Sequence, residues 1–507
     1  MPLDTVDLTN RVDAARVQVS ASLDPRTRSD LGQFLTPASV ARLMAGMLSS
    51  TPRVVRILEP GAGVGSLIAA AVEELCARED RPERIEVTAY EMDPVLVAPL
   101  RETMQACDDH CRGAGVVFRG EVVEGDFLEL VCGALRHDVF GATIPPAYDV
   151  VITNPPYRKI NSGSRHRELT RAASLETTNL YTAFAGVALQ MLVPGGEIVA
   201  ITPRSFANGR YFRPFRELLL SQSSIRQVHI FESRKDAFKE DAVLQENIIW
   251  RAIRGATTDQ VLITSSNGHP DASFGRTIRA DQLVWPADPE KFIHIAPDDG
   301  AQAIANAMRA LPGTLAKLGL TVSTGRVVDF RAAEQLRQHA EPNTVPLLYP
   351  THVRDGYTRW PVDGKKPNAL HVDDYTRELL VPEGVYVLVK RFSAKEERRR
   401  IVAAMYDPAR LPSPEGIAFE NHLNYIHRNG AGLDREIAAG LVMYLNSTLA
   451  DQAFRQFSGH TQVNAGDLRT MAFPSAEALH ALSVTFGDTL PAQEDIDAAL
   501  AQVVAIS

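Results

Sequence analysis

The sequence predicts an α/β fold over roughly the first half of the chain, with a largely parallel sheet covered by helices on both faces. Two observations support this prediction. Short β-branched runs alternate with helical segments between residues 31 and 255, and the first run ends in a glycine-rich turn. Strands that alternate with helices are typical of parallel sheets, because each crossover helix returns the chain to the starting edge.

The expected elements follow one another in a regular order. The expected strands are short apolar or alternating runs at 53–60, 85–93, 148–154, 197–203, 227–231 and 246–253. The expected helices are longer periodic segments at 66–79, 95–104 and 179–196. Pro194-Gly195-Gly196 is expected to close the last of these helices, because proline and two glycines do not continue a helix.

The pattern changes after about residue 286. Short apolar runs such as 345–350 and 385–392 are separated by Pro, Gly and charged clusters, and helical segments such as 436–457 follow. We therefore expect two domains, residues 1–290 and residues 291–507, the second with an α+β architecture.

Composition excludes several classes of protein. Of the 507 residues, 45% are hydrophobic and 23% charged, as in globular proteins rather than low-complexity or collagen-like ones. Four cysteines cannot form a disulfide scaffold, and Cys107, His110 and Cys111 lack the second ligand pair of a metal site. The charged N-terminus and the lack of a long apolar run predict a cytoplasmic protein with no membrane partner.

The charge is unevenly distributed. The net charge is −9, with 18 acidic and 7 basic side chains between Glu59 and Asp149. The stretch from Arg204 to Lys239 carries eight Lys and Arg against three acids. Binding of a polyanion depends on the local field rather than on the sum, so a nucleic-acid partner is compatible with this chain.

The first chemical signal is the glycine-rich turn at residues 58–65, between a strand and a helix. Gly61 and Gly63 let the backbone turn tightly and approach a ligand closely. The spacing differs from that of dinucleotide binders, and Glu59 precedes the glycines. A carboxylate suits a ligand with an ammonium and a sulfonium, which favours S-adenosylmethionine over a pyrophosphate. A purely structural turn is the alternative.

Two further acids follow successive strands. Glu91 ends the strand at 85–93 and can accept both ribose hydroxyls of a nucleoside. Asp126 ends a third strand-like run and can accept from an adenine amino group, with Phe127 beside the ring. The carboxyl ends of parallel strands meet at one edge of a sheet, so we expect these acids to lie close together.

The most specific signal is Asn154-Pro155-Pro156-Tyr157, directly after the strand at 148–154. Two prolines fix the backbone and remove two N–H donors, so carbonyls stay free to accept. The exocyclic amine of a base is a poor nucleophile because its lone pair is delocalised. The Asn154 side-chain oxygen and the Pro155 carbonyl can each accept one amine N–H, while Tyr157 stacks on the base. This motif favours methyl transfer to an amine.

These motifs resemble those of the amino-group DNA methyltransferases of restriction–modification systems, in particular the gamma-ordered adenine-N6 group that includes the TaqI-type methylases. Residues 32–37 resemble the family's N-terminal cofactor segment, which implies that Thr36 contacts the cofactor. Residues 58–65, 125–127 and 154–157 resemble its glycine, adenine-contact and catalytic motifs, and Asn154 would then border the cofactor as well. Residues 179–184 resemble the helix that follows, which implies that Phe184 lies near the cofactor adenine. Phe238 matches the second aromatic residue that packs against an extruded base.

The resemblance implies a mixed seven-stranded Rossmann-like sheet, with S-adenosyl-L-methionine as cofactor, followed by a DNA-recognition domain. It implies methylation of adenine N6 in double-stranded DNA by base flipping. We further expect a monomer, with a separate cognate restriction endonuclease as a partner. Segments 322–330 and 444–474 resemble target-recognition segments. Segments 388–392 and 395–400, and the basic stretch at 204–239, would then contact phosphates.

Several alternatives stay open. Protein-glutamine and RNA-base methyltransferases share the motif at 154–157, although they are usually shorter and lack a domain like residues 300–507. Cytosine-N4 methylation is chemically adjacent, but a serine is commoner there in place of Asn154. None of the four cysteines follows a proline, which argues against covalent catalysis on cytosine C5. A non-catalytic binding module is the remaining class.

Overall fold

A computed structural model describes residues 7–22, 34–49, 52–135, 147–231, 246–266, 274–393, 397–457 and 462–504. The chain divides into two compact units, Met1–Pro297 (unit 1) and Asp298–Ser507 (unit 2). Within the described ranges, no helix is long and apolar enough to cross a membrane.

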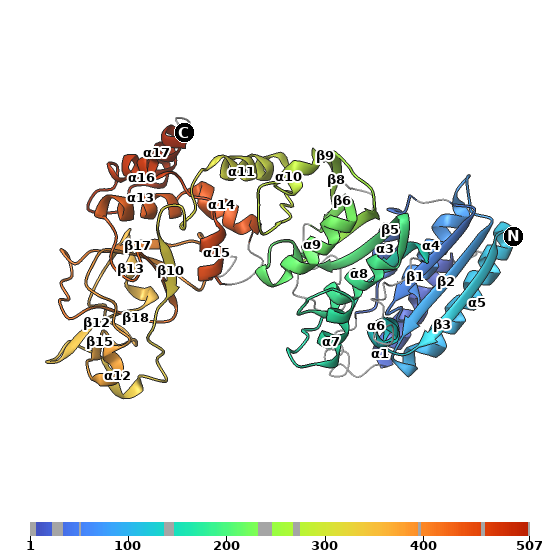
Figure 1. The fold of residues 1–507 in the computed structure, drawn as a ribbon, viewed down its shortest axis with the longest axis horizontal. Coiled ribbons are helices and arrows are strands. Elements are labelled where there is room, and N and C mark those ends of the chain that lie inside the picture. The colour runs from blue at the N-terminus through green and yellow to red at the C-terminus, as the bar shows by residue number, and fades with distance from the viewer. Residues whose placement is uncertain are drawn as a thin grey trace. The chain divides into compact units, whose positions relative to one another are not determined.

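Unit 1 is an α/β unit, and Figure 1 shows its strands side by side with helices packed against them. Its strands are β1 (Val54–Pro60), β2 (Arg84–Glu91), β3 (Val117–Glu124), β4 (Tyr148–Thr153), β5 (Leu192–Pro203), β6 (Ser223–Phe231), β7 (Asn247–Arg254), β8 (Gln260–Ser266) and β9 (Phe274–Arg279). Its helices are α1 (Leu8–Ser22), α3 (Ala38–Ala45), α4 (Ser66–Ala77), α5 (Pro94–Ala114), α6 (Phe127–Leu135), α7 (Arg165–Ala172), α8 (Leu180–Gln190), α9 (Arg213–Gln222) and α10 (Ala280–Leu283).

The described strands of unit 1 form one mixed nine-stranded sheet in the order β3-β2-β1-β4-β5-β7-β6-β8-β9. The strands β3, β2, β1, β4 and β5 run parallel, and β7 runs antiparallel to both of its neighbours. The mixed α/β prediction is confirmed, but the predicted count of seven strands is too low. The additional strands β8 and β9 extend the edge beyond β6, where the short alternating run at 260–266 pairs in parallel with β6.

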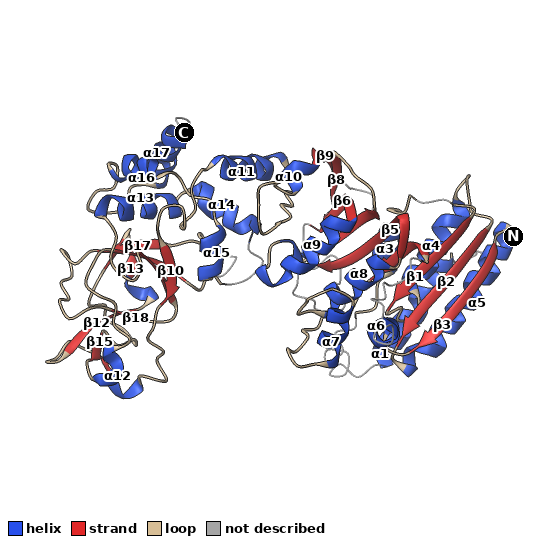
Figure 2. Cartoon of the chain, in the orientation of Figure 1, coloured by secondary structure: helices blue, strands red, loops and turns tan. Residues whose placement is uncertain are grey.

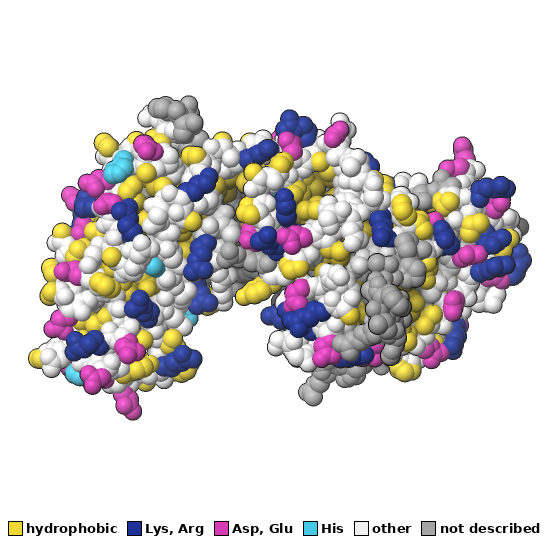
Figure 3. Space-filling view, in the orientation of Figure 1, with side chains coloured by type: hydrophobic (Ala, Val, Ile, Leu, Met, Phe, Trp, Pro, Cys, Tyr) yellow, Lys and Arg dark blue, Asp and Glu magenta, His cyan; other side chains and the backbone are white. Residues whose placement is uncertain are grey.

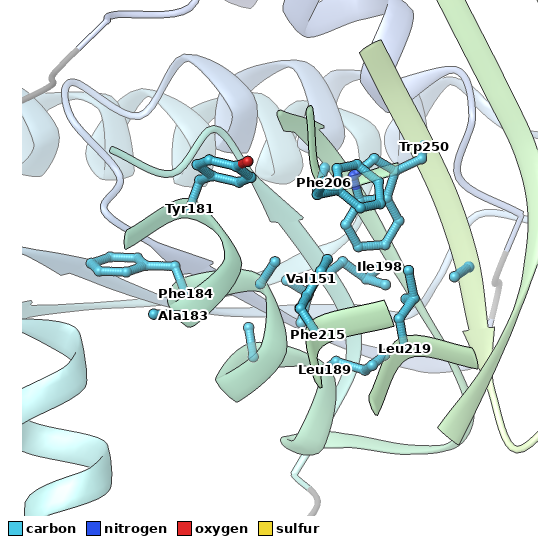
Figure 4. Packing of buried hydrophobic residues seen from close by; sticks show 14 of the residues in the cluster. Val151, Tyr181, Ala183, Phe184, Leu189, Ile198, Phe206, Phe215, Leu219 and Trp250 are labelled. Carbon is cyan, nitrogen blue, oxygen red and sulfur yellow. The ribbon is translucent and has the colours of Figure 1, made fainter. Parts of the chain in front are cut away.

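Both faces of the sheet are buried, as expected for parallel strands. Ile57 and Leu58, adjacent on β1, point to opposite faces of the sheet. Both are fully buried, because helices cover both faces. Ile57 packs in the core beneath α1, α3, α4 and α5, whereas Leu58 packs in the core beneath α6, α8 and α9. Figure 4 shows part of this second core, in which Phe206, Phe215 and Trp250 pack together.

The strand order reverses at β1. From β1 the chain proceeds outward through β2 to β3, and then returns to place β4 on the other side of β1. In open α/β sheets, ligands bind outside the carboxyl ends of the strands at such a switch point. The loops that follow β1, β2, β3 and β4 therefore meet at this edge.

The predicted helix at 179–196 is too long. Helix α8 ends at Gln190, and β5 begins at Leu192 and runs through Pro194-Gly195-Gly196. The pairing of β5 with β4 shifts between Tyr148 and Val150. Residues 194–196 therefore form an irregular start to β5 rather than the end of a helix. A proline without an N–H is tolerated at such an irregularity.

Unit 2 has short strands joined by long loops, as Figure 2 shows. Its strands, within the described residues, are β10 (Thr321–Thr324), β11 (Leu336–Arg337), β12 (Thr344–Leu348), β13 (Val353–Arg354), β14 (Tyr357–Thr358), β15 (Ala369–His371), β16 (Tyr386–Lys390), β17 (Ala403–Tyr406), β18 (Ala418–Phe419) and β19 (Leu423–His427). Its helices are α11 (Asp299–Ala310), α12 (Asp374–Arg377), α13 (Arg435–Leu445), α14 (Thr448–Phe457), α15 (Ala465–Thr470), α16 (Ala476–Ser483) and α17 (Gln493–Val504).

The described strands of unit 2 form a six-stranded and a four-stranded sheet, which agrees with the α+β prediction. The expected helical segment at 436–457 is two helices, α13 and α14. They separate at Asn446, whose side-chain amide donates to the carbonyls of Ala403, at 2.9 Å, and Val442, at 2.8 Å. An asparagine that bonds its own backbone favours a helix end.

Candidate active site

The glycine-rich turn after β1 is held by the neighbouring strand β2. The N–H groups of Gly61 and Ala62 both donate to the carbonyl of Tyr90, at 2.9 and 2.8 Å. Gly63 has a φ of +59°, and a Cβ there would lie 2.9 Å from the side chain of Leu35. Glycine is required at this position because any other residue would meet both a strained backbone and a close neighbour.

Glu91 lies where the sequence predicts, at the end of β2, and lines a cleft at the switch point. Its Oε2 accepts the N–H of Gly63 at 2.7 Å, and its Oε1 accepts the N–H of Asp93 at 2.8 Å. Burial raises the pKa of Glu91, and these backbone donors partly oppose that shift. Each carboxylate oxygen keeps a second lone pair, so Glu91 can also accept from a ribose hydroxyl.

Glu59 occupies a different environment. Its side chain is 2% exposed and is not part of the cleft lining. Its Oε2 has no hydrogen-bond partner in the described part of the chain. Burial raises the pKa of Glu59 well above its ordinary value, and the charge of Glu91 raises it further. A contact between Glu59 and a cationic ligand therefore stays a prediction.

Asp126 and a group of aromatic rings form another part of the cleft. Asp126 precedes α6, where its Oδ1 accepts the N–H of Glu129 at 3.0 Å. The ring of Phe127 lies 5.3 Å from that of Phe184 on α8 and 5.1 Å from that of Tyr90, between centroids. Buried aromatic rings beside a carboxylate suit a flat heterocycle that carries an amine.

Asn154, which follows β4, is oriented by the segment that contains Thr36. Its side-chain Nδ2 donates to the carbonyl of Phe34 at 2.8 Å and to the Oγ1 of Thr36 at 3.1 Å. Because a carbonyl can only accept, the amide nitrogen must face Phe34. Its Oδ1 therefore faces away from Phe34 and has no hydrogen-bond partner in the described residues, while the residue itself lines the cleft.

The rest of the motif is placed as follows. Pro156 lines the cleft, whereas Pro155 is buried and lies outside the lining. The half-buried Tyr157 directs its hydroxyl to the carbonyl of Ile201, at 3.4 Å, and its ring lies 5.7 Å from that of Phe34. Burial raises the pKa of Tyr157. Phe238, the predicted second aromatic residue, lies outside the described residues.

Together these elements enclose a cleft of roughly 800 Å³ that is open to solvent. The predicted residues that line it are Gly61, Gly63, Glu91, Asp126, Phe127, Asn154, Pro156 and Phe184. The predicted residues that do not line it are Thr36, Glu59, Pro155 and Tyr157, although Thr36 bonds directly to a residue that does.

The other residues of the cleft were not predicted one by one, although Phe34, Leu35, Gly125 and Leu180 lie within predicted motif segments. These other residues are Phe34, Leu35, Tyr90, Met92, Leu96, Gly125, Arg158, His166 and Leu180. Met92 and Arg158 directly follow Glu91 and Tyr157, so adjacency to a predicted residue was a usable signal for both. His166 lies on α7, and its sequence context carries no motif that would have pointed to the cleft.

In unit 2, two predicted recognition segments and one predicted phosphate-contact segment meet at the edge of the six-stranded sheet where β10 and β16 end and β19 begins. The backbone N–H of Gly325 donates to the carbonyl of Leu423 at 2.8 Å. The N–H of Arg391 donates to the carbonyl of His422 at 2.9 Å, and the carbonyl of Arg391 accepts the N–H of Val463 at 2.7 Å. Segments 322–330, 388–392 and 444–474 therefore share this edge. Phe392 is 44% exposed there, and its ring lies 4.9 Å from that of His422.

Some of the predicted phosphate contacts are wrong. Arg216 is fully buried and donates to the carbonyls of Phe206, Gly209 and Glu290. Arg400 is fully buried, with its guanidinium 5.4 Å from the ring centroid of Phe454 and its Nε donating to Ser393. These two arginines are buried by tertiary packing, and their hydrogen bonds connect neighbouring loops. In the view of Figure 3, the Lys and Arg side chains of each unit are interspersed with acidic ones.

Comparisons with known proteins find relatives over nearly the whole chain. Residues 138–238, which include the motif at 154–157, match the Eco57I restriction-modification methylase family. The chain is 41% identical to the type II methyltransferase M.PstI of Providencia stuartii, over 95% of this chain and 95% of that relative. It is 42% identical to the type II methyltransferase M.BsuBI of Bacillus subtilis, over 93% and 92% of the two chains.

Among solved structures, the fold is similar to that of the type IIL restriction-modification enzyme MmeI in complex with DNA. The TM-score is 0.52 at 10% sequence identity, over 98% of this chain and 76% of that one. This likeness concerns the fold alone, whereas the two sequence relatives cover nearly the whole chain. The chain therefore belongs to the type II DNA methyltransferases of restriction–modification systems, and S-adenosyl-L-methionine is its methyl donor.

Proposed function

We propose that this enzyme transfers a methyl group to the N6 amine of adenine in double-stranded DNA. The observation that carries the proposal is the orientation of Asn154. Its amide nitrogen is engaged by Phe34 and Thr36, and its Oδ1 is left without a described partner in a residue that lines the cleft. A fixed acceptor beside a methyl donor is suited to draw an N–H of a planar amine and make its lone pair available.

The cleft fits the cofactor. Glu91 would hold the ribose, Asp126 the adenine amine, and Phe127 with Phe184 the adenine ring, beside the bare backbone of Gly61 and Gly63. When bound, S-adenosyl-L-methionine supplies a methyl group activated by the sulfonium.

The target base must leave the duplex, because its amine is paired there and out of reach of a protein cleft. In this proposal the Oδ1 of Asn154 and the carbonyl of Pro155 accept the two amine hydrogens. The rings of Tyr157 and Phe238 hold the extruded base. Extrusion costs a few kcal/mol, and stacking on aromatic rings offsets part of it.

Unit 2 would read the DNA site through the sheet edge described above. The edge carries Lys390 and Arg391 beside the exposed ring of Phe392, which combines cations for phosphates with an apolar surface for bases. We further assign the chain, as a monomer, to the modification activity of a restriction–modification system with a separate endonuclease. Its DNA substrate would place it in the cytoplasm.

The identity of the methylated base tests the proposal. DNA from cells that express the chain and lack other methyltransferases should be digested to nucleosides and analysed by mass spectrometry. We expect N6-methyldeoxyadenosine, and far less of it in cells that express Asn154→Ala. N4-methyldeoxycytidine would instead support the cytosine alternative, since the same acceptor serves that amine. Methylation of RNA or protein alone would refute the proposal.

A further inference from the structure

We propose that His166 is a positioning residue of the cofactor site, which holds Asp126 in the orientation that recognises the amine of the cofactor's adenine. This inference rests on the role proposed above for Asp126. It adds a residue that neither the sequence motifs nor the comparisons assign.

The contact between the two side chains is direct. The Nε2 of His166 lies 2.8 Å from the Oδ2 of Asp126, and both residues line the cleft. The other oxygen of Asp126, Oδ1, accepts the N–H of Glu129 at the start of α6. Asp126 is thus fixed at both oxygens, and each oxygen keeps a lone pair for a ligand.

Charge supports the same role. Burial favours protonation of Asp126, but the hydrogen bonds from His166 and Glu129 outweigh it, so the pKa of Asp126 is lowered. The bond to Asp126 raises the pKa of His166 against an opposing effect of burial, with a further increase from Glu129 and a decrease from Arg158. These hydrogen bonds favour the ionised form of Asp126, in which both oxygens act only as acceptors.

The helix that carries His166 is anchored in unit 1. Leu169, one turn later on α7, is fully buried in the core that also contains Phe127 and Phe184. Arg167 and Arg171, on the same helix, both pair with Glu176 beyond its end. A side chain on an anchored helix positions its partner more precisely than one on a loop.

The chemical consequence concerns discrimination at one atom. The amine of adenine donates to a carboxylate, whereas hypoxanthine presents a carbonyl oxygen at that position and would be repelled. An oriented acceptor should therefore favour S-adenosylhomocysteine over S-inosylhomocysteine. Loss of the His166 bond should weaken this preference, while a general structural role would weaken the binding of both ligands alike.

The test is calorimetry with these two ligands on the full chain. In His166→Leu we expect a roughly tenfold loss of affinity for S-adenosylhomocysteine and less than about threefold for S-inosylhomocysteine. His166→Gln keeps a donor near the position of Nε2 and should bind within about threefold of the wild type. His480→Leu, an exposed position on α16 of unit 2, is the matched control.

The outcomes separate this inference from the proposed site. Asp126→Asn should also reduce the preference for adenine, because an amide can donate to the hypoxanthine carbonyl. If Asp126→Asn reduces it but His166→Leu does not, the role of His166 is refuted while that of Asp126 stands. If Asp126→Asn leaves the preference unchanged, both roles are refuted. Equal losses for both ligands in His166→Leu would also overturn the inference.

A second readout follows the histidine itself. Because the bond to Asp126 raises the pKa of His166, an NMR titration should show this pKa falling in Asp126→Asn. An unchanged pKa would mean that the two side chains do not interact in solution, and would overturn the inference independently of ligand binding.

Discussion

Thr36 offers a sharp test of how the site is built, because two roles for it lead to different kinetics. The family resemblance implies that Thr36 contacts the cofactor. In the structure its Oγ1 accepts from the Nδ2 of Asn154 at 3.1 Å, and the residue does not line the cleft. Thr36→Val keeps the shape of this buried side chain and removes only its hydroxyl, which is the acceptor for Asn154. The substitution should therefore disturb the orientation of Asn154 rather than the binding of the cofactor.

The magnitude follows from the bond that is lost. A neutral hydrogen bond contributes about 0.5–1.5 kcal/mol, and about 1.4 kcal/mol corresponds to a tenfold change. Asn154 keeps its second bond, to the carbonyl of Phe34 at 2.8 Å, so the amide does not turn freely. We expect the single-turnover rate of methyl transfer to fall roughly 2- to 12-fold.

The assay compares rate and affinity in the same variants. Single-turnover methylation of an unmethylated duplex gives the rate, and calorimetry gives the affinity for S-adenosylhomocysteine. Thr36→Ser keeps the hydroxyl and should keep the rate near that of the wild type. Thr257→Val, at an exposed position between β7 and β8, is the control. A parallel loss of cofactor affinity with an unchanged rate would refute the reasoning and support a direct contact.

Three further predictions concern buried and exposed groups. Burial raises the pKa of Glu59 in the folded state. Below the ordinary pKa range of glutamate, Glu59 is protonated in both states and its ionisation does not affect stability. As the pH rises from that range through the raised pKa, ionisation of Glu59 increasingly destabilises the fold. Glu59→Gln should therefore raise Tm at about pH 8 by more than at about pH 5. An equal shift of Tm at both pH values would contradict this reasoning. Arg398→Ala, at an exposed position, should reduce the slope of log Kd for DNA against log salt by about one. Arg400→Met should leave that slope unchanged and lower the free energy of unfolding by about 2–4 kcal/mol in denaturant titrations. The reverse pattern would show that Arg400 contacts a phosphate. Tyr157→Phe should slow methyl transfer less than about threefold, because the hydrogen bond from the Tyr157 hydroxyl to the Ile201 carbonyl, at 3.4 Å, is long. Tyr157→Ala should slow methyl transfer at least tenfold, because it removes the ring on which the base stacks. Equal rates for the two variants would argue against stacking.

Much of this site follows from local sequence patterns. Gly63 and Glu91 were predictable because a turn with positive φ demands glycine and because parallel strands end at one edge. Asn154 was predictable from the two prolines that follow it. In each case the functional signal lies within a few residues of the group that carries it.

The rest depends on contacts that are distant along the chain. Nothing near His166 indicates that α7 brings it to Asp126, 40 residues earlier. The charge of Arg400 suggested a surface residue, but its partners Ser393 and Phe454 take it inside the fold. The placement of Glu59 is also tertiary, because adjacency to the glycine turn does not decide which way a strand side chain points.

The central claim is that the Oδ1 of Asn154, held in place by Phe34 and Thr36, accepts a hydrogen from the amine that is methylated. The most direct measurement is the single-turnover rate of methyl transfer by Asn154→Ala on an unmethylated duplex, together with its affinity for S-adenosylhomocysteine. We predict that the rate falls by at least about 10²-fold while the affinity stays within about threefold. A rate near that of the wild type would contradict the mechanism.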